Sequence, residues 1–383
     1  MTFPGECFAT STFLITFAYM KRICIVAGAR PNFVKVAPLM RAIDNARKNG
    51  EDVECQLVYA GTADDPTLEP QLFDDLQMRR PDAFLGVPQN SSLNVTTGLV
   101  MGAFEQYLEQ HAADVVVVVD DLASTMAAAI VTKKRGLLLA HLVAGTRSFD
   151  IRMPKEVNRL VIDGLSDYLF TAGAGSVSIT TREGVEMSQV YMVGNILVDA
   201  IRFSHQRLRR PAMAEGLGLH EGQYVLFTLN RRALLADEAS LGRMLRELQD
   251  SGLVVVAPLR GEAAAKVSGL TARSPRFHVV EPLSYLEFGW LSAHAQAVVT
   301  DSGNVAEEAT FNGVPCITLN SYTEHIETVR LGTNELVGED AGKLREALCR
   351  LRQGRWKQGS LPPQWDGRTA ERIVSILLSE RKN

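Results

Sequence analysis

The sequence lacks the patterns on which several large classes of protein depend. Its five cysteines are scattered and form no Cys-x-x-Cys pair, which argues against a disulfide framework and against a zinc site; they are Cys7, Cys24, Cys55, Cys316 and Cys349. No apolar run is long enough to cross a bilayer. We therefore expect a protein of the reducing cytoplasm, with no metal ion and no membrane partner.

Strong charge of one sign is also missing. Lys and Arg number 40 and Asp and Glu number 44, a formal net charge of −4. This balance excludes nonspecific nucleic-acid binding as the main activity and leaves room for a local pocket that binds a small anion. The chain has no Walker loop, no Gly-x-Gly-x-x-Gly fingerprint and no nucleophile elbow. These three motifs are typical of ATP-binding proteins, of NAD-binding proteins and of hydrolases, respectively. Because they are missing, we expect no cofactor.

The first residues stand apart from the rest. The apolar stretch 13–19 has no basic segment before it and no small-residue cleavage site after it, so it makes a poor signal peptide. A regular strand pattern starts only after Met20. We interpret residues 1–19 as an extension that is flexible or does not belong to the native protein.

From there the chain alternates between strand and helix patterns. An apolar strand at 23–27 is followed by a turn at 28–32 and by apolar residues at roughly helical spacing. The five consecutive valines 115–119 predict a strand that is buried on both faces, as in a parallel sheet. Further strands are expected at 55–60, 137–143, 168–171 and 191–194, and a helix is expected at 124–134.

The alternation restarts after a charged, glycine-containing segment at 206–222, which we interpret as an interdomain connection. Strands are then expected at 224–229, 253–258, 277–280, 297–300 and 315–319, with a last helix at 369–380. The prediction is an α/β protein of two Rossmann-like, doubly wound domains, residues 20–205 and 223–365, with segment 366–383 packing back. A ligand cleft is expected between the domains, at the carboxyl ends of the strands.

Two turns have the chemistry of phosphate binding. Arg30 follows the first strand in Gly-Ala-Arg-Pro, and Ser302 follows a later strand in Asp-Ser-Gly-Asn, just before a helix that carries Glu307 and Glu308. Either turn alone also fits an ordinary strand–helix connection or a helix N-cap. Two such turns facing one cleft favour a nucleotide diphosphate as ligand.

Acidic residues and histidines supply the candidates for proton transfer. Asp120 and Asp121 end the valine strand, where they serve either in acid–base chemistry or as a helix cap. His141 lies in an apolar strand and is expected to be a hydrogen-bonded core residue. His325 lies in a polar loop and is expected to face the cleft.

Taken together, these segments resemble the non-hydrolysing UDP-N-acetylglucosamine 2-epimerase family, from about residue 20 to about residue 380. The motifs follow the family's order and spacing. They are 28–32 (like G-T-R-P-E), 120–122 (like G-D-T), 141–147 (like H-V-E-A-G-L-R), 154–159 (like P-E-E-x-N-R), 194–199 (like G-N-T-V-I-D), 301–309 (like D-S-G-G-x-Q-E-E-A) and 366–373 (like the closing helix).

The resemblance implies the fold of B-type glycosyltransferases, a homodimer, and interconversion of UDP-N-acetylglucosamine and UDP-N-acetylmannosamine. In that reaction the C2 proton is removed, UDP leaves C1, and both return to the glycal on the other face of C2. The resemblance also implies that UDP or a UDP-sugar is bound, with Phe288 against the uracil. The implied binding residues are Arg30, Asn158, Arg159, Asn230, Arg231, Phe288, Ser302, Gly303, Asn304, Glu307 and Glu308.

Several acid–base positions of the family carry other residues here. The glutamate of H-V-E-A-G is Val143, the first glutamate of P-E-E is Lys155, and the histidine of T-x-H-R-x-E-N is Asn230. Valine has no proton to exchange, and an asparagine amide is not a useful acid or base. The candidate catalytic residues that are left are Asp121, Glu156 and His325, the last at the arginine of T-T-E-R-P-E.

Three functions therefore stay open at the level of sequence. The first is a UDP-sugar 2-epimerase with a remodelled site. The second is a relative with changed chemistry, such as a glycosyltransferase. The third is a nucleotide-sugar-binding protein without turnover. The loss of one catalytic acid or base costs on the order of 10²–10⁴-fold in rate, so the replacements favour altered or lost epimerisation, whereas the resemblance favours an epimerase.

Overall fold

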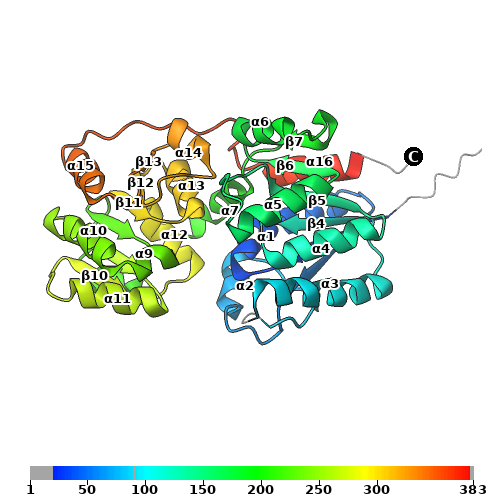
Figure 1. Cartoon of the computed structure of the whole chain (residues 1–383), viewed down its shortest axis with the longest axis horizontal. Helices are drawn as coiled ribbons and strands as arrows, with labels where there is room; N and C mark the ends of the chain where they lie inside the picture. Colours follow the sequence, from blue (N-terminus) through cyan, green and yellow to red (C-terminus); the bar gives the residue numbers. More distant parts are fainter. Residues whose placement is uncertain (1–19, 89–90, 380–383) are drawn as a thin grey trace, which may run out of the picture.

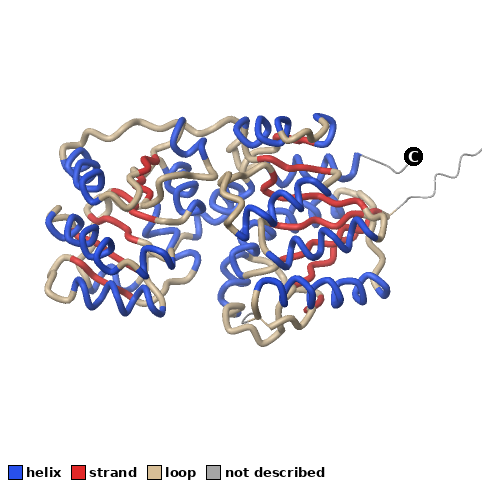
Figure 2. Tube along the Cα trace, in the orientation of Figure 1, coloured by secondary structure: helices blue, strands red, loops and turns tan. Residues whose placement is uncertain are grey.

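The computed structural model describes residues 20–88 and 91–379, so the apolar stretch 13–19 lies outside the described residues. Two α/β lobes lie side by side, and each has a central sheet with helices on both faces (Figures 1 and 2). The fold class expected from the sequence is confirmed.

The sheet of the first lobe has seven parallel strands in the order β3-β2-β1-β4-β5-β6-β7. The order reverses between β1 and β4, as in a doubly wound sheet. The strands are β1 Lys21–Ala27, β2 Val53–Tyr59, β3 Ala83–Phe84, β4 Val115–Val119, β5 Leu138–Ala144, β6 Tyr168–Thr171 and β7 Val190–Met192. The helices are α1 Arg30–Lys48, α2 Pro70–Leu76, α3 Leu93–Gln110, α4 Ala123–Lys134, α5 Pro154–Leu165, α6 Ala174–Arg182 and α7 Ile196–Ser204, with short 3-10 turns at Met187–Gln189 and His205–Arg207.

The sheet of the second lobe has six parallel strands in the order β10-β9-β8-β11-β12-β13, and its order reverses between β8 and β11. The strands are β8 Tyr224–Phe227, β9 Val254–Pro258, β10 Phe277–Val280, β11 Ala297–Thr300, β12 Cys316–Thr318 and β13 Asn334–Leu336. The helices are α8 Ala212–Gly216, α9 Arg232–Ala236, α10 Glu238–Asp250, α11 Gly261–Thr271, α12 Tyr285–Ala293, α13 Gly303–Asn312, α14 Ile326–Arg330 and α15 Ala341–Arg352.

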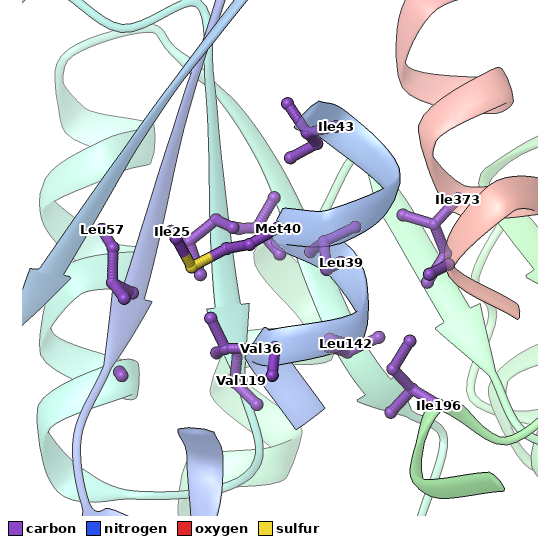
Figure 3. Packing of buried hydrophobic residues seen from close by; sticks show 14 of the residues in the cluster. Ile25, Val36, Leu39, Met40, Ile43, Leu57, Val119, Leu142, Ile196 and Ile373 are labelled. Carbon is purple, nitrogen blue, oxygen red and sulfur yellow. The ribbon is translucent and has the colours of Figure 1, made fainter. Parts of the chain in front are cut away.

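The core of the first lobe forms where α1 packs on the sheet. All five valines of β4 are fully buried, as their pattern predicted. In Figure 3, Ile25 lies beside Met40 and Val119 beside Val36 of α1, while Leu39 faces the side on which Ile196 and Ile373 complete the same cluster. Burial of apolar surface, at roughly 25 cal/mol per Å², is the main force that fixes α1 against β1 and β4.

The last helix, α16 Thr369–Ser379, leaves the second lobe and returns to the first, where it lies against α1 (Figure 1). The Asp199 carboxylate of α7 accepts hydrogen bonds from the backbone N–H groups of Thr369 and Ala370, at 3.1 and 2.8 Å. These two bonds satisfy donors at the start of α16 and so hold it at its docking position.

The structure differs from the sequence-based expectations mainly at element ends. Helix α1 begins at Arg30, inside the segment 28–32 that was expected to be a turn, because Asn32 Oδ1 accepts from the N–H groups of Gly28 and Ala29 at 2.9 and 3.1 Å. Strands β3 and β13 were not predicted, since Ala83–Phe84 has only two residues and Asn334–Leu336 is polar at two of its three positions. Within the described part of the chain, no helix is both long and apolar enough to cross a membrane.

Candidate active site between the two domains

A cavity of about 300 Å³ lies between the two domains, next to a second cavity of about 480 Å³. The first domain contributes residues that follow β1, β4 and β5, and the second contributes residues that follow β8, β11 and β12. We call the two cavities together the interdomain cleft. They share six lining residues: Lys155, Asn230, Ser302, Asn304, Glu324 and His325.

Asp121 lines the cleft just after β4 and is held by two cations. Its Oδ2 lies 2.5 Å from Arg159 Nη2, and its Oδ1 lies 3.4 Å from Lys155 Nζ. Burial by itself would raise the pKa of Asp121, but the positive charges of Lys155 and Arg159 outweigh it and lower the pKa below its ordinary value. Asp121 is therefore a persistent carboxylate and a weak proton acceptor.

Asp120 lies beside Asp121 and also lines the cleft. Its backbone is left-handed, with φ of 59°, a conformation that Asp tolerates better than most residues. Its Oδ1 lies 2.5 Å from Lys35 Nζ, and its Oδ2 accepts from Asn32 Nδ2 at 2.7 Å. Burial opposes the charge on Lys35, but Asp120 and Glu307 raise its pKa above the ordinary value. Lys35 is thus a lasting cation within the cleft.

Val143, in β5, lines the cleft next to Asp120 with φ of 75°. Left-handed backbone is strained for a β-branched residue, at a cost of about 1–3 kcal/mol, and such strain gathers at functional sites. The side chain that the sequence resemblance would make a glutamate is here an apolar wall of the cavity.

Arg159, on α5, joins the two domains. Its guanidinium lies 2.6 Å from Glu324 of the second domain and 3.0 Å from Glu156. Glu156 also accepts hydrogen bonds from Ser148 N and Oγ, both at 2.9 Å, and from Phe149 N at 3.0 Å. Both oxygens of Glu156 are therefore occupied, and Glu156 lines neither cavity of the cleft.

His325 enters the cleft from the second domain. Its Nδ1 lies 2.8 Å from Glu307 Oε1, and Asn195 Nδ2 of the first domain donates to the same Glu307 oxygen at 2.7 Å. Burial would lower the pKa of His325, but the Glu307 charge raises it above the ordinary histidine value. The raised pKa favours the protonated imidazole, which can act as a proton donor.

The loops after β8 and β11 form the second-domain wall. Ser302 caps α13, and Ser302, Gly303 and Asn304 all line the cleft at the start of this helix. The Asp301 carboxylate accepts from the N–H groups of Asn230 and Arg231 at 2.7 and 2.5 Å. This fixes the β8 loop beside the N-terminus of α13, where a helix favours an anion.

Arg30 does not line the cleft, although its neighbours Ala29 and Pro31 do. It lines a separate cavity of about 460 Å³, together with Arg260. Its Nε is buried and has no hydrogen-bond partner among the described residues. Burial and the charge of Arg260 lower the pKa of Arg30, although Glu69 and Asp75 act in the opposite direction. Two guanidinium groups with a spare buried donor suit an anionic ligand.

Besides Glu156 and Arg159, four predicted residues line none of these cavities, namely Asn158, Phe288, Glu307 and Glu308. Asn158 donates from Nδ2 to the Asp121 backbone oxygen at 2.8 Å. Phe288, on α12, packs against an apolar cluster that includes Leu291. Burial, together with the charge of neighbouring Glu307, raises the pKa of Glu308 to about 8.

The structure also brings Lys35 and Glu324 into the cleft, neither of which was among the predicted site residues. Asp120, which the sequence left open between acid–base chemistry and a helix cap, lines the cleft as well. Lys35 is three residues after Asn32, so both lie on one face of α1, which is a signal that the sequence carries. The side-chain direction of Asp120 depends on its left-handed backbone, which the sequence does not show. Within residues 20–88 and 91–379, no cluster of three or more His, Cys, Asp or Glu side chains is placed to hold a metal ion. His141 is buried, with Nδ1 2.5 Å from Asp163.

Fold and cleft together define the class. Two doubly wound domains with a polar cleft at both switch points are the architecture of B-type glycosyltransferases and of enzymes built like them. A plant UDP-glucosyltransferase from Polygonum tinctorium shares this fold, with a TM-score of 0.57 at 14% identity over 96% of this chain and 100% of its own.

Within this class, comparison with known proteins identifies the family. The family model described as UDP-N-acetylglucosamine 2-epimerase matches residues 45–378, and the chain belongs to this family. It is 31% identical to the UDP-2,3-diacetamido-2,3-dideoxy-D-glucuronate 2-epimerase of Pseudomonas aeruginosa, over 93% of this chain and 99% of that one. The crystal structure of Methanocaldococcus jannaschii UDP-GlcNAc 2-epimerase, in complex with UDP-GlcNAc and UDP, superposes with a TM-score of 0.81 at 29% identity, covering 94% of this chain and 100% of that chain.

Proposed function

We propose that the protein is a UDP-sugar 2-epimerase that binds its substrate across the interdomain cleft and inverts C2 of the sugar. The observation that carries this proposal is the meeting of cations and proton-transfer groups in one cavity at two sheet switch points. Lys35 and Lys155 supply positive charge there, and Asp121 and His325 supply ionisable groups. The similar chain whose structure holds UDP-GlcNAc and UDP supports the choice of ligand.

The diphosphate is proposed to bind at the N-terminus of α13. Ser302, Gly303 and Asn304 begin this helix, whose N–H groups and dipole favour negative charge. Arg30 and Arg231 are proposed to add guanidinium groups as the domains close on the ligand. Asn230 also lines the cleft and is proposed to contact the substrate there. Glu308 and Phe288 are proposed to hold the nucleoside.

The chemistry follows from the charges around the cleft. Removal of the C2 proton needs a general base, and departure of UDP from C1 needs stabilisation of the developing negative charge. His325, with its raised pKa, is the proposed acid toward the leaving diphosphate, and Glu307 orients it. Asp121, whose carboxylate is held in place by Arg159 and Lys155, is proposed to contact the sugar as a negatively charged group. Glu156 and Asn158 are proposed to act indirectly, by holding Arg159 and the backbone of Asp121.

A second candidate is a protein that binds UDP-sugars without epimerising them. The specific observation in its favour is Val143, an apolar side chain in the cavity wall at the position where the family motif has a glutamate. Asn230 lines the same cavity and likewise cannot exchange a proton at useful pH.

One experiment separates the two. The full chain is incubated in heavy water with UDP-N-acetylglucosamine or with UDP-2,3-diacetamido-2,3-dideoxy-D-glucuronate, and C2 is followed by NMR. An epimerase places deuterium at C2 and yields the 2-epimer. Saturable binding of UDP by calorimetry with no deuterium at C2 of either sugar contradicts epimerisation and supports the binding protein. No heat with UDP or with either sugar contradicts both.

Assembly and location belong to the same proposal. The protein is proposed to be a cytoplasmic homodimer, and neither nucleic acid nor membrane is a proposed partner. The exposed apolar side chains Leu93, Val95 and Leu99 of α3 support a dimer contact on the first domain. The described cysteines Cys24, Cys55, Cys316 and Cys349 are all free thiols, in keeping with a reducing compartment.

A further inference from the structure

Asp120 presents a carboxylate at a place where the motif that this segment resembles has glycine. The left-handed φ of 59° explains why glycine fits this position, and Asp is among the few other residues that tolerate it. The difference matters for chemistry, because a glycine at this position would place no side chain in the cavity wall. In this chain a titratable group lines the cleft there instead.

Asp120 and Val143 are neighbours at the carboxyl edge of the sheet. Val119 and Leu142 are register partners in β4 and β5, and the Asp120 N–H donates to the Leu142 carbonyl at 3.3 Å. Both residues line the same cavity, and both have a left-handed backbone. The carboxylate of Asp120 therefore lies at the end of the strand next to the one that carries Val143, where the motif has a glutamate.

The carboxylate of Asp120 is positioned yet still accessible. Its side chain is 18% exposed, and among the described residues it is held by one cation, Lys35, and one amide, Asn32. A carboxylate offers about four lone-pair directions, so two remain for a substrate. Asp121, by contrast, has two cationic partners, Arg159 and Lys155, which keep it deprotonated.

We propose that Asp120 is a catalytic residue that exchanges the proton at C2 of the sugar, in place of the side chain that Val143 lacks. This rests on the proposed function. The Asp120 carboxylate takes the C2 proton and becomes a carboxylic acid, the C2–H electron pair forms the C1–C2 double bond, and the C1–O bond breaks with its electrons on UDP. In return, UDP adds to C1, and C2 takes a proton from a solvent water molecule on its other face. The Asp120 carboxylic acid gives its proton to the hydroxide that is left, which restores water and the Asp120 carboxylate.

Lys35 is a positioning residue in this scheme. Its ammonium group fixes the direction of the carboxylate while Asn32 holds the second oxygen. Lys35 is itself buried, so the pair cannot separate into water without leaving one charge uncompensated. Asp120 is therefore pinned at the cavity wall before substrate arrives.

Two single variants test the assignment. Asp120→Asn keeps the shape and tolerates left-handed backbone, and Asp120→Gly restores the residue that φ favours. We expect both to lower deuterium exchange at C2 of the active UDP-sugar by about 100-fold or more. UDP affinity by calorimetry should stay within about threefold. Exchange is compared per mole of folded protein, because Asp120→Gly leaves the buried Lys35 without its carboxylate partner and is expected to lower the melting temperature.

A rescue distinguishes chemistry from structure. Formate added to Asp120→Gly should restore part of the exchange, because a small carboxylic acid fits the space that the side chain leaves. The double variant Asp120→Gly/Val143→Glu should also regain exchange, since it returns a carboxylate to the neighbouring strand. A purely structural role of Asp120 predicts neither rescue.

The outcomes separate the two proposals. Exchange in the unmodified protein that persists at a similar rate in Asp120→Gly overturns the assignment of Asp120 and leaves the epimerase proposal intact. Absence of exchange in the unmodified protein overturns both. Loss of exchange in Asp120→Gly without rescue by formate or by Val143→Glu also contradicts a catalytic role.

Discussion

Glu307 and Glu308 are adjacent carboxylates on α13, and their surroundings give them different chemistry. Glu307 is paired with His325 and accepts a hydrogen bond from Asn195, so its negative charge is compensated. Glu308 has no such compensation: burial, with the charge of Glu307 beside it, raises its pKa to about 8. At neutral pH Glu308 is therefore mostly protonated in the free protein and can donate a hydrogen bond.

The first residue-scale prediction concerns stability and pH. Since the pKa of Glu308 is raised to about 8 in the folded state, the unfolded chain loses this proton first as pH rises. The contribution of Glu308 to stability is thus complete below about pH 4.5 and is lost as pH rises through its folded pKa. We expect Glu308→Gln to match the unmodified protein near pH 4.5 and to be more stable at pH 8.

Urea unfolding at a series of pH values measures this. The control is Glu371→Gln on α16, an exposed residue whose ion pair with Arg368 lies at the surface, and it should leave the pH profile unchanged. Parallel profiles for Glu308→Gln and the unmodified protein would show that Glu308 ionises normally.

At the scale of elements, the start of α13 is the most constrained part of the site. A Cβ atom on Gly303 would lie 2.6 Å from His325 Cδ2 and 2.7 Å from Nε2. Gly303 is helical, so alanine would suit its backbone and only the contact with the ring forbids it. The glycine therefore leaves room for the imidazole between α13 and the cleft.

The matching prediction is that Gly303→Ala displaces His325 and separates it from Glu307. We expect a fall in epimerase turnover of about 10-fold or more, because general-acid chemistry typically contributes 10²–10⁴-fold. The pKa of His325, followed by NMR titration, should drop toward its ordinary value as the Glu307 contact weakens.

A second glycine on an exposed helix provides the control. Gly269 of α11 has no atom within 4 Å of a built Cβ, so Gly269→Ala should raise stability by up to about 1 kcal/mol and leave turnover unchanged. Normal turnover and an unchanged His325 titration in Gly303→Ala would mean that the ring moves aside without consequence.

At the scale of the whole molecule, hydrogen bonds and ion pairs join the two domains at several points. Arg159 reaches Glu324, Asn195 reaches Glu307, and the Gly175 N–H donates to Glu327 at 3.0 Å. Helix α16 follows the second domain in the chain but packs on the first domain, so the polypeptide passes between the domains a second time. A ligand bound across the cleft touches both domains, so its binding is expected to favour the closed arrangement.

The whole-molecule prediction concerns assembly. If α3 forms the contact of the proposed dimer, Leu99→Glu places a charge in an apolar interface and should yield monomers in sedimentation velocity. Leu361→Glu, an equally exposed leucine in the segment before α16, is the control and should stay dimeric. A monomeric unmodified protein at micromolar concentration would contradict the dimer itself.

The sequence by itself determined the alternation of strands and helices, because a short run of β-branched residues such as Val115–Val119 suits a strand that is buried on both faces. It also determined where the chemistry lies along the chain, since turns after parallel strands meet at one sheet edge. Only the tertiary structure decided what each side chain does there. The partners of Asp121 and Glu156, the left-handed backbone of Asp120 and the separate cavity of Arg30 all depend on contacts between residues far apart in sequence, and charge and proton affinity depend on such distances.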